Sequence, residues 1–182
     1  MNRQIATFRM GETRMGVDIL LVKEVYRRMR VHPVPGAPPQ LLGLMNLRGR
    51  VVSVVDLAAC FRRSGVASDR GQLLIFKTEG ELGKFVRDGR LPERATRLGE
   101  DIVGLLIDEM DDVMTVSPDA VLPPPPNLGG LDDQLIGGVI RTESELVVLI
   151  DAPAVLDRVV RAMDRFVEAI SGVREAGPGE RG

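Results

Sequence analysis

The sequence has few of the residue types that build catalytic and cofactor sites. Its 182 residues include no tryptophan, one tyrosine, one histidine and one cysteine, and aromatic residues make up only 3% of the chain. The scarcity of rings argues against a groove that stacks bases or sugars on aromatic side chains. A single cysteine, Cys60, excludes an internal disulfide and a cysteine-based zinc site, and fits a reducing, cytoplasmic setting.

The sequence also lacks an excess of either charge and any long hydrophobic run. It has 24 basic and 26 acidic residues, with a net charge of −2. Proteins that bind a nucleic-acid backbone need a basic excess, so we expect no nucleic-acid partner. No apolar run approaches the ~18 residues of a membrane span, and residues 1–5 do not resemble a signal peptide. We therefore expect no direct membrane insertion.

The residues for catalysis and metal binding are missing as well. His32, the only histidine, lies in a proline-rich loop far in sequence from any suitable serine, so a Ser-His-Asp triad cannot be assembled. An acidic cluster lacks the ligand spacing and central glycine of an EF-hand and is better interpreted as surface carboxylates that can meet a basic partner. This cluster comprises Asp108, Glu109, Asp111 and Asp112. We expect no enzyme activity, no metal and no cofactor.

What the sequence does contain is a series of short strand patterns. Apolar runs bounded by turn residues predict strands at 5–10, 15–19, 41–45, 51–55, 73–77, 102–107, 113–116, 135–141 and 146–150. Residues 19–26 predict a short helical turn that leads into a strand. Residues 78–101 are rich in charge and glycine without a steady apolar period, and we interpret them as a long, partly ordered connection.

The two halves of the chain follow one plan. Each half has a glycine, a strand, an acidic residue, a proline loop, a hairpin and an aspartate in the same order. The aligned pairs are Gly16 with Gly104, Glu24 with Asp112, Gly43 with Gly138, and Asp56 with Asp151. This order favours a duplication over a chance likeness of apolar strands. Two β-units of this size need to pack together, because each is too small for a core of its own.

The C-terminal part predicts one amphipathic helix over residues 153–171. Asp151 can cap its start, and Pro153 suits its first turn. Apolar residues at helical spacing form one stripe: Leu156, Val159, Val160, Met163, Val167 and Ile170. Gly172 is a natural stop, and the polar, glycine-rich residues 172–182 are expected to be disordered.

The most informative segment is Asn46-Leu47-Arg48-Gly49, which lies between two apolar runs. The pattern predicts a strand, a tight turn that carries an arginine, and a second strand. Hairpin arginines are usually exposed without a role, but an arginine at a rigid corner is also well placed to bind a partner. Since no catalytic constellation accompanies it, we interpret the chain as a docking module.

Residues 43–61 carry a family resemblance. They read Gly-Leu-Met-Asn-Leu-Arg-Gly-Arg-Val-Val-Ser-Val-Val-Asp-Leu-Ala-Ala-Cys-Phe and resemble the signature of the CheW family of bacterial chemotaxis coupling proteins. The likeness covers residues 4–157, as one domain. It implies an all-β fold of two packed five-stranded SH3-like β-barrels with short helical turns and a C-terminal α-helix. The barrels would cover about 4–75 and 76–151, a division that leaves room for exchanged strands.

The resemblance also implies a function. CheW-like proteins are non-catalytic adaptors that couple chemoreceptors to a CheA-type histidine kinase in cytoplasmic arrays on the inner face of the membrane. The implied partners are the chemoreceptor's cytoplasmic tip, a helical hairpin that enters a groove between the barrels, and the kinase's regulatory domain. The alternative is a stand-alone β-barrel that binds a small apolar ligand, with residues 78–101 as a lid.

By matching position, the resemblance implies a set of partner-binding residues. Asn46, Arg48 and Gly49 fall on the family's functional hairpin, and Gly43 supports it. The remaining residues fall on the edge that faces receptor and kinase, and on the second barrel: Val22, Glu24, Val25, then Gly104 and Met110. Met110 stands where the family usually has a smaller β-branched residue.

Overall fold

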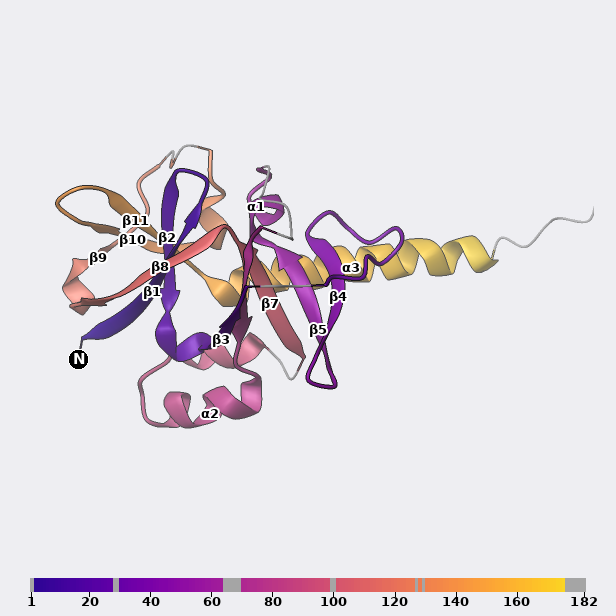
Figure 1. Ribbon diagram of the computed structural model, residues 1–182, viewed down its shortest axis with the longest axis horizontal. Helices are drawn as coiled ribbons and strands as arrows, with labels where there is room; N and C mark the ends of the chain where they lie inside the picture. Colours follow the sequence, from indigo (N-terminus) through magenta and orange to yellow (C-terminus); the bar gives the residue numbers. More distant parts are fainter. Residues whose placement is uncertain are drawn as a thin grey trace, which may run out of the picture.

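Eleven strands and a few helices make up the part of the chain that the computed structural model describes, which is residues 2–27, 30–63, 70–98, 101–126, 128 and 130–175 (Figure 1). The strands are β1 (Arg3–Met10), β2 (Thr13–Asp18), β3 (Val22–Tyr26), β4 (Leu41–Leu47), β5 (Arg50–Asp56), β6 (Gln72–Phe76), β7 (Ile102–Ile107), β8 (Glu109–Val116), β9 (Val121–Leu122), β10 (Ile136–Arg141) and β11 (Leu146–Ile150). The helices are α1 (Leu57–Cys60), α2 (Glu79–Arg87) and α3 (Ala152–Glu175), with 3-10 turns η1 (Ile19–Leu21), η2 (Glu93–Leu98), η3 (Pro118–Ala120) and η4 (Asp133–Leu135). Each of the predicted strands overlaps one of these strands, and the helical turn before β3 is confirmed.

The strands form two sheets with the same plan. One has the order β8-β1-β2-β11-β10-β9 and the other the order β3-β6-β7-β5-β4. Each contains one parallel pair, β11 with β2 and β5 with β7, at matching places. When the two strand orders are aligned position by position, β2 corresponds to β7, β3 to β8, β4 to β10 and β5 to β11, as the repeat alignment predicts. The topology therefore confirms the duplicated plan.

The mostly-β architecture with a C-terminal helix is confirmed, but its details differ from two five-stranded barrels. One sheet has six strands, because β9 adds to the edge of β10, and the other has five. Hydrogen bonding does not close either sheet into a ring among the described strands. The expected boundary between the barrels, near residue 75, does not separate the two sheets. β1 and β2 belong to the sheet that contains β8 to β11, whereas β6 and β7 belong to the sheet that contains β3 to β5.

Gly43 and Gly138 occupy equivalent bulges in β4 and β10. Their φ angles are +149° and +156°, and an added Cβ would lie 2.2 Å from the His32 carbonyl oxygen and 2.9 Å from the Leu122 carbonyl oxygen, respectively. In both sheets, a glycine thus lets a neighbouring segment pack against the bulged strand. These close backbone contacts explain why both halves have a glycine at this position of the repeat.

The apolar side chains form one shared core and two smaller ones. The shared core lies between the sheets and includes α1, α2 and the start of α3, with Phe8, Met15, Leu57, Phe76, Leu82 and Val155 among its buried residues. The five-stranded sheet has a second cluster of buried residues, Met45, Val52, Val54, Leu73, Ile75 and Ile102. The six-stranded sheet has a third, Ile5, Val116, Ile140, Val147 and Leu149. The shared core is what the small size of each β-unit requires.

The interpretation of residues 78–101 as a partly ordered connection was wrong for most of the segment. It contains α2, which starts with a capping box in which Thr78 and Glu81 bond reciprocally, and η2. Leu82, Phe85 and Val86 follow helical spacing and pack on the shared core. The surrounding charged residues obscured this short apolar period in the sequence. The segment joins β6 to β7, where the first half has only the turn between β1 and β2.

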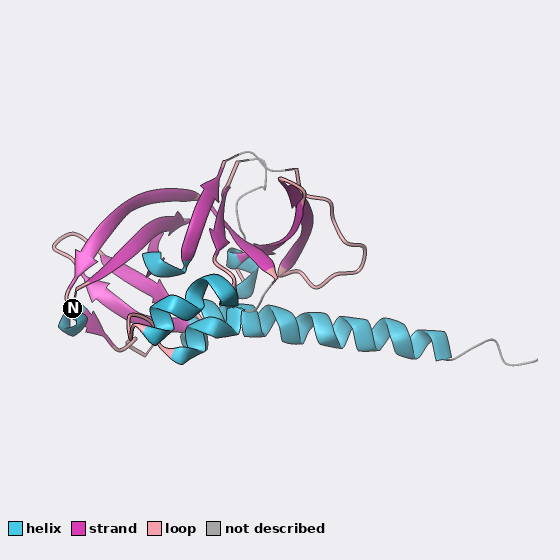
Figure 2. Ribbon diagram, turned by 90° about the horizontal axis from the view of Figure 1, so that it is seen from below, coloured by secondary structure: helices cyan, strands magenta, loops and turns pink. Residues whose placement is uncertain are grey.

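The C-terminal helix α3 begins as predicted and ends later. The Asp151 Oδ1 atom accepts a hydrogen bond from the Ala154 N–H at 3.2 Å, and Pro153 is buried in the first turn. The helix continues through Gly172 to Glu175 and projects away from the sheets (Figure 2). The helix thus extends beyond the predicted end at Gly172, and residues 176–182 lie outside the described residues. Within the described part, no helix is long and apolar enough to cross a membrane.

Cys60 is expected to be chemically inert in the folded protein. It is buried at the end of α1, and burial raises the pKa of its thiol to about 12. Because the thiolate is the reactive form, we expect negligible reaction with a thiol reagent at pH 8 until the protein unfolds. Stopped-flow labelling with and without denaturant measures this. Labelling of the native protein at the rate of a small-molecule thiol would show that Cys60 is accessible.

Candidate functional site

The hairpin between β4 and β5 holds Arg48 in a defined conformation. Arg48 and Gly49 are the two turn residues, with φ angles of +53° and +83°, as the twist of a two-residue hairpin requires. The Asn46 side-chain oxygen accepts a hydrogen bond from the Gly49 N–H at 2.8 Å. An arginine held in the left-handed region costs backbone energy. The predicted hairpin is confirmed, and the turn fixes the direction in which Arg48 leaves the sheet.

Arg48 reaches across to β3. Its Nη1 atom lies 3.7 Å from the Glu24 Oε2 atom, and its guanidinium carbon lies 5.8 Å from the centre of the Tyr26 ring. The Tyr26 hydroxyl donates to the same Glu24 oxygen at 3.2 Å. The Arg48 side chain remains 77% exposed, so this long ion pair contributes little to stability. The arrangement places the positive charge of Arg48 at the surface, and the contacts with Tyr26 and Glu24 restrict the position of its guanidinium group.

Tyr26 was absent from the residues expected at this site. It lies two residues after Glu24 on β3, and alternate residues of a strand share a face. That spacing was the available signal. The approach of β3 to the hairpin could not be deduced from it, because the two elements lie at opposite edges of the sheet and meet only where the sheet curls (Figure 2).

The other two residues expected on β3 point in different directions. Val22 is half-buried and packs against the shared core, whereas Val25 is 37% exposed. Lys77 holds the start of this edge strand, because its Nζ donates to the carbonyl oxygens of Leu20 and Val22. Burial lowers the pKa of Lys77. The exposed residues of this edge are thus Lys23, Val25 and Arg27, with the half-buried Glu24 and Tyr26 between them.

Gly104 and Met110 do not join the hairpin. Gly104 is buried in β7, in the sheet that also carries Arg48, and an added Cβ would lie 2.6 Å from the Leu73 side chain. Met110 lies on β8 in the other sheet, half-buried against the shared core, and its N–H donates to the Gln72 Oε1 atom at 3.2 Å. The expectation that both lie on the second barrel holds for Met110 only, since strand exchange places Gly104 with the hairpin's own sheet.

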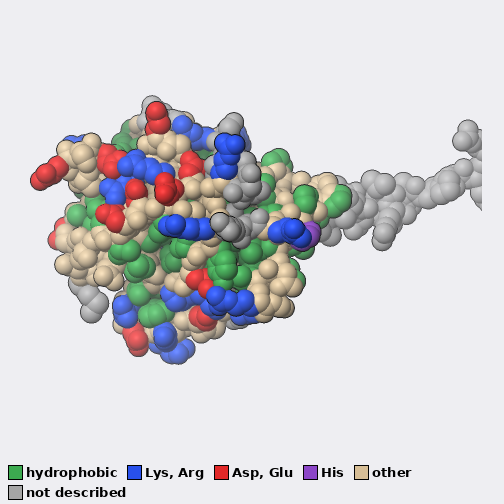
Figure 3. Space-filling view, viewed as in Figure 1, with side chains coloured by type: hydrophobic (Ala, Val, Ile, Leu, Met, Phe, Trp, Pro, Cys, Tyr) green, Lys and Arg blue, Asp and Glu red, His purple; other side chains and the backbone are tan. Residues whose placement is uncertain are grey.

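The acidic cluster is engaged within the protein. The Arg14 Nε atom lies 3.1 Å from Asp111 Oδ2, and its Nη1 lies 3.1 Å from Glu145 Oε1, while Nη2 pairs with Asp112. Arg9 also contacts Asp111 and Glu145, at 3.3 and 3.0 Å. Figure 3 shows these alternating acidic and basic side chains at its upper left. No group of metal-ligating residues occurs among the described residues. Asp111 and Asp112 serve internal ion pairs, and the Asp108 Oδ2 atom accepts a hydrogen bond from the Gly11 N–H.

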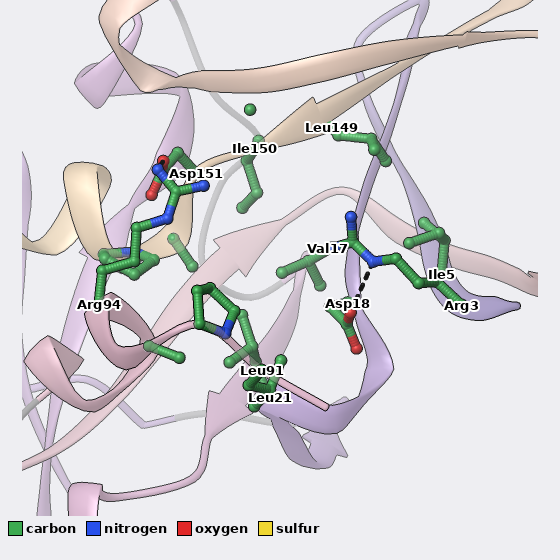
Figure 4. Close-up of a pocket in the computed structure, with 15 residues that line it drawn as sticks. Arg3, Ile5, Val17, Asp18, Leu21, Leu91, Arg94, Leu149, Ile150 and Asp151 are labelled. Atoms are coloured by element: carbon green, nitrogen blue, oxygen red, sulfur yellow. Dashed lines mark hydrogen bonds and ion pairs between the residues drawn. The ribbon is translucent and has the colours of Figure 1, made fainter. Parts of the chain in front are cut away.

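A cavity between the six-stranded sheet, η2 and the start of α3 bears on the ligand-binding alternative (Figure 4). Its volume is about 80 Å³, and its lining includes Ile5, Leu21, Leu91 and Ile150. Two ion pairs lie beside it: Arg3 with Asp18 at 3.1 Å and Arg94 with Asp151 at 2.8 Å. Ligand pockets usually measure about 300–1,000 Å³, so this cavity is too small for one. Two larger surface hollows, of about 370 and 360 Å³, are lined mainly by polar and charged residues and by the proline-rich segment, respectively. The segment expected to act as a lid instead packs on the shared core through α2 and on α3 through η2, so this alternative gains no support.

Comparison with known proteins identifies the fold and the family. Residues 4–160 match the CheW-like domain. The chain is 28% identical over 148 residues to the chemotaxis protein CheW of Treponema pallidum, which covers 81% of this chain and 78% of that protein. It is 28% identical over 153 residues to the chemotaxis protein CheW of Rhizobium meliloti, covering 84% and 86%.

A solved structure shares the architecture. The crystal structure of the scaffolding protein CheW from Thermoanaerobacter tengcongensis superposes with a TM-score of 0.65, at 23% identity, over 84% of this chain and 86% of that one. The topology and the hairpin agree with the match over residues 4–160, which covers most of the sequence. The chain therefore belongs to the family of CheW-like domains.

Proposed function

We propose that this protein is a non-catalytic adaptor that couples chemoreceptors to a CheA-type histidine kinase. The observation that carries the proposal is the presentation of Arg48. A strained, two-residue turn holds its guanidinium 77% exposed beside Glu24 and Tyr26. Such a charge favours a specific protein partner, because complementary charge sets specificity and association rate. Proteins named chemotaxis protein CheW match most of the chain, which supports the same function.

The partners follow from this proposal. The kinase's regulatory domain and the receptor's cytoplasmic tip would bind around Arg48, Glu24 and Val25, and the protein would work in the cytoplasm at receptor arrays. The two curved sheets would correspond to the SH3-like barrels of the family. Gly104 would act indirectly, because it lies in the middle of the sheet that holds the hairpin. Met110 would contribute through the edge strand β8.

Reversing the charge of Arg48 tests the proposal. Arg48→Glu puts a carboxylate beside Glu24, and we expect at least about tenfold weaker binding to the regulatory domain, since arginine is a frequent hot-spot residue. Glu24→Lys should act similarly. Binding is measured by calorimetry, and receptor coupling by the kinase's phosphorylation rate. Folding should be little affected, because the pair is exposed and long.

Arg141→Glu is the matched control. Arg141 is exposed at the end of β10, in the hairpin that corresponds to β4 and β5, and we expect this variant to bind as the wild type does. Wild-type binding and coupling by both Arg48→Glu and Glu24→Lys would refute the assignment of the site.

A further inference from the structure

A small cavity opens at the seam where β3 approaches the β4–β5 hairpin. Its volume is about 140 Å³. β3 and β4 are the two edges of the five-stranded sheet and no hydrogen-bonded ladder joins these two strands, although the segment after β3 bridges to β4 at His32 and Leu44. The cavity therefore lies beside Arg48 and leads from the surface into the sheet's own core.

The floor of the cavity is apolar. It consists of Leu47, Ile75 and Ile102. Ile75 and Ile102 belong to the sheet's buried cluster, and the half-buried Leu47 packs against it. An apolar cavity of about 150 Å³ accepts a six-carbon ring, so 140 Å³ suits one aliphatic side chain and is too small for a larger ligand. A side chain placed here would extend the existing core.

The rim is mainly basic. Lys23, Arg48 and Arg50 surround the opening, and Glu24 is the single carboxylate. Lys23 pairs with Glu81 on α2, and Glu24 already faces Arg48. Arg50 has no ion-pair partner among the described residues. In Figure 3, basic side chains border hydrophobic atoms in this lower central region. A partner's carboxylate fits this rim, whereas a partner's lysine or arginine does not.

We propose that the cavity receives one aliphatic side chain of a protein partner, with an acidic residue next to it that pairs with Arg50 and Arg48. This inference rests on the proposed function and specifies its contact: Arg48 recognises charge at the rim, and the cavity supplies an apolar anchor. Anchors that fill a desolvated pocket surrounded by polar residues carry much of the energy of protein interfaces.

Filling the cavity tests the inference. Leu47→Phe adds a ring at the half-buried floor and keeps every charge of the rim. We expect about tenfold weaker binding to the regulatory domain of the organism's CheA-type kinase, measured by calorimetry. Leu44→Phe is the matched control, because Leu44 lies on the outer face of the same strand, is 36% exposed, and does not line the cavity. It should bind as the wild type does.

Leu47→Ala provides a second variant, because it removes part of the floor without adding volume. It should also weaken binding, by about threefold, and circular dichroism of each variant verifies folding. Wild-type affinity of both Leu47 variants, together with loss of binding by Arg48→Glu, would overturn the cavity's role and leave the adaptor function standing. Failure of the wild-type protein to bind the kinase domain would instead refute the proposed function.

Discussion

Gly43→Ala is expected to lower the free energy of unfolding by about 3 kcal/mol, through backbone strain and overpacking. An alanine Cβ would lie 2.2 Å from the His32 carbonyl oxygen and 3.0 Å from the Pro33 Cα. Both atoms belong to the backbone, which cannot relieve the clash by a change of rotamer as a side chain can. The His32 N–H and carbonyl both bond to Leu44, so relief would break this bridge. Urea denaturation measures the change.

Two other glycines serve as comparisons. Gly138→Ala should cost a similar amount, because its Cβ would meet the Leu122 carbonyl oxygen at the equivalent bulge. Gly11→Ala should cost only about 1 kcal/mol, since Gly11 also has a positive φ but nothing lies within 4 Å of an added Cβ. Equal losses for Gly43→Ala and Gly11→Ala would mean that the contact with His32 is unimportant.

Arg14→Ala is expected to destabilise the protein by about 1–2 kcal/mol at pH 7, because Arg14 itself is largely buried but its partners are partly exposed. Its side chain is only 16% exposed and contacts Asp111, Asp112 and Glu145. Removing the cation leaves the partly exposed Asp111 and Glu145 with Arg9 as their remaining partner, whereas water screens the exposed Asp112. Arg9→Ala is the control: Arg9 is 37% exposed and pairs with Asp111 and Glu145 only, so we expect less than half the loss.

The Arg14 effect should depend on pH. A hydrogen bond from the Thr7 hydroxyl, together with Arg14, lowers the pKa of Asp112 below its ordinary value of 3.8. A carboxylate with a lowered pKa stabilises the fold above its unfolded pKa, and this contribution is lost as the pH falls through the folded pKa. The difference between wild type and Arg14→Ala should therefore shrink as the pH falls below about 4, through the folded pKa of Asp112. A constant difference in denaturation across this range would contradict the ion-pair explanation.

Local features of this fold could be predicted from the sequence because their determinants are adjacent residues. The hairpin depends on the turn residues Arg48 and Gly49 and on Asn46, three residues before Gly49. The start of α3 depends on Asp151 and the first turn that follows it. Helix α2 depends equally on local residues, and a search for a capping box at Thr78 and Glu81 would have found it.

The relations between distant segments could not be predicted in this way. Nothing in β7 itself shows that Gly104 lies against Leu73, in the sheet that carries Arg48, and not in the other sheet. The contact of Arg48 with Glu24 depends on the curl of a five-stranded sheet. The cavity beside them depends on the same curl, since its floor and rim come from β3, β4, β5, β6 and β7.

The exchange of strands between the halves has a consequence for how the protein folds and could have arisen. β1 and β2 pair with β8 and β11, more than 90 residues away, so the six-stranded sheet cannot be completed until almost the whole domain has left the ribosome, whereas the five-stranded sheet needs only the residues up to Ile107. Such long-range pairing slows folding. A chain with only one copy of the repeated unit would lack a hairpin for its own sheet. Two such chains could each donate their first hairpin to the sheet of the other. An ancestor of half this length would therefore be expected to fold as a strand-swapped dimer.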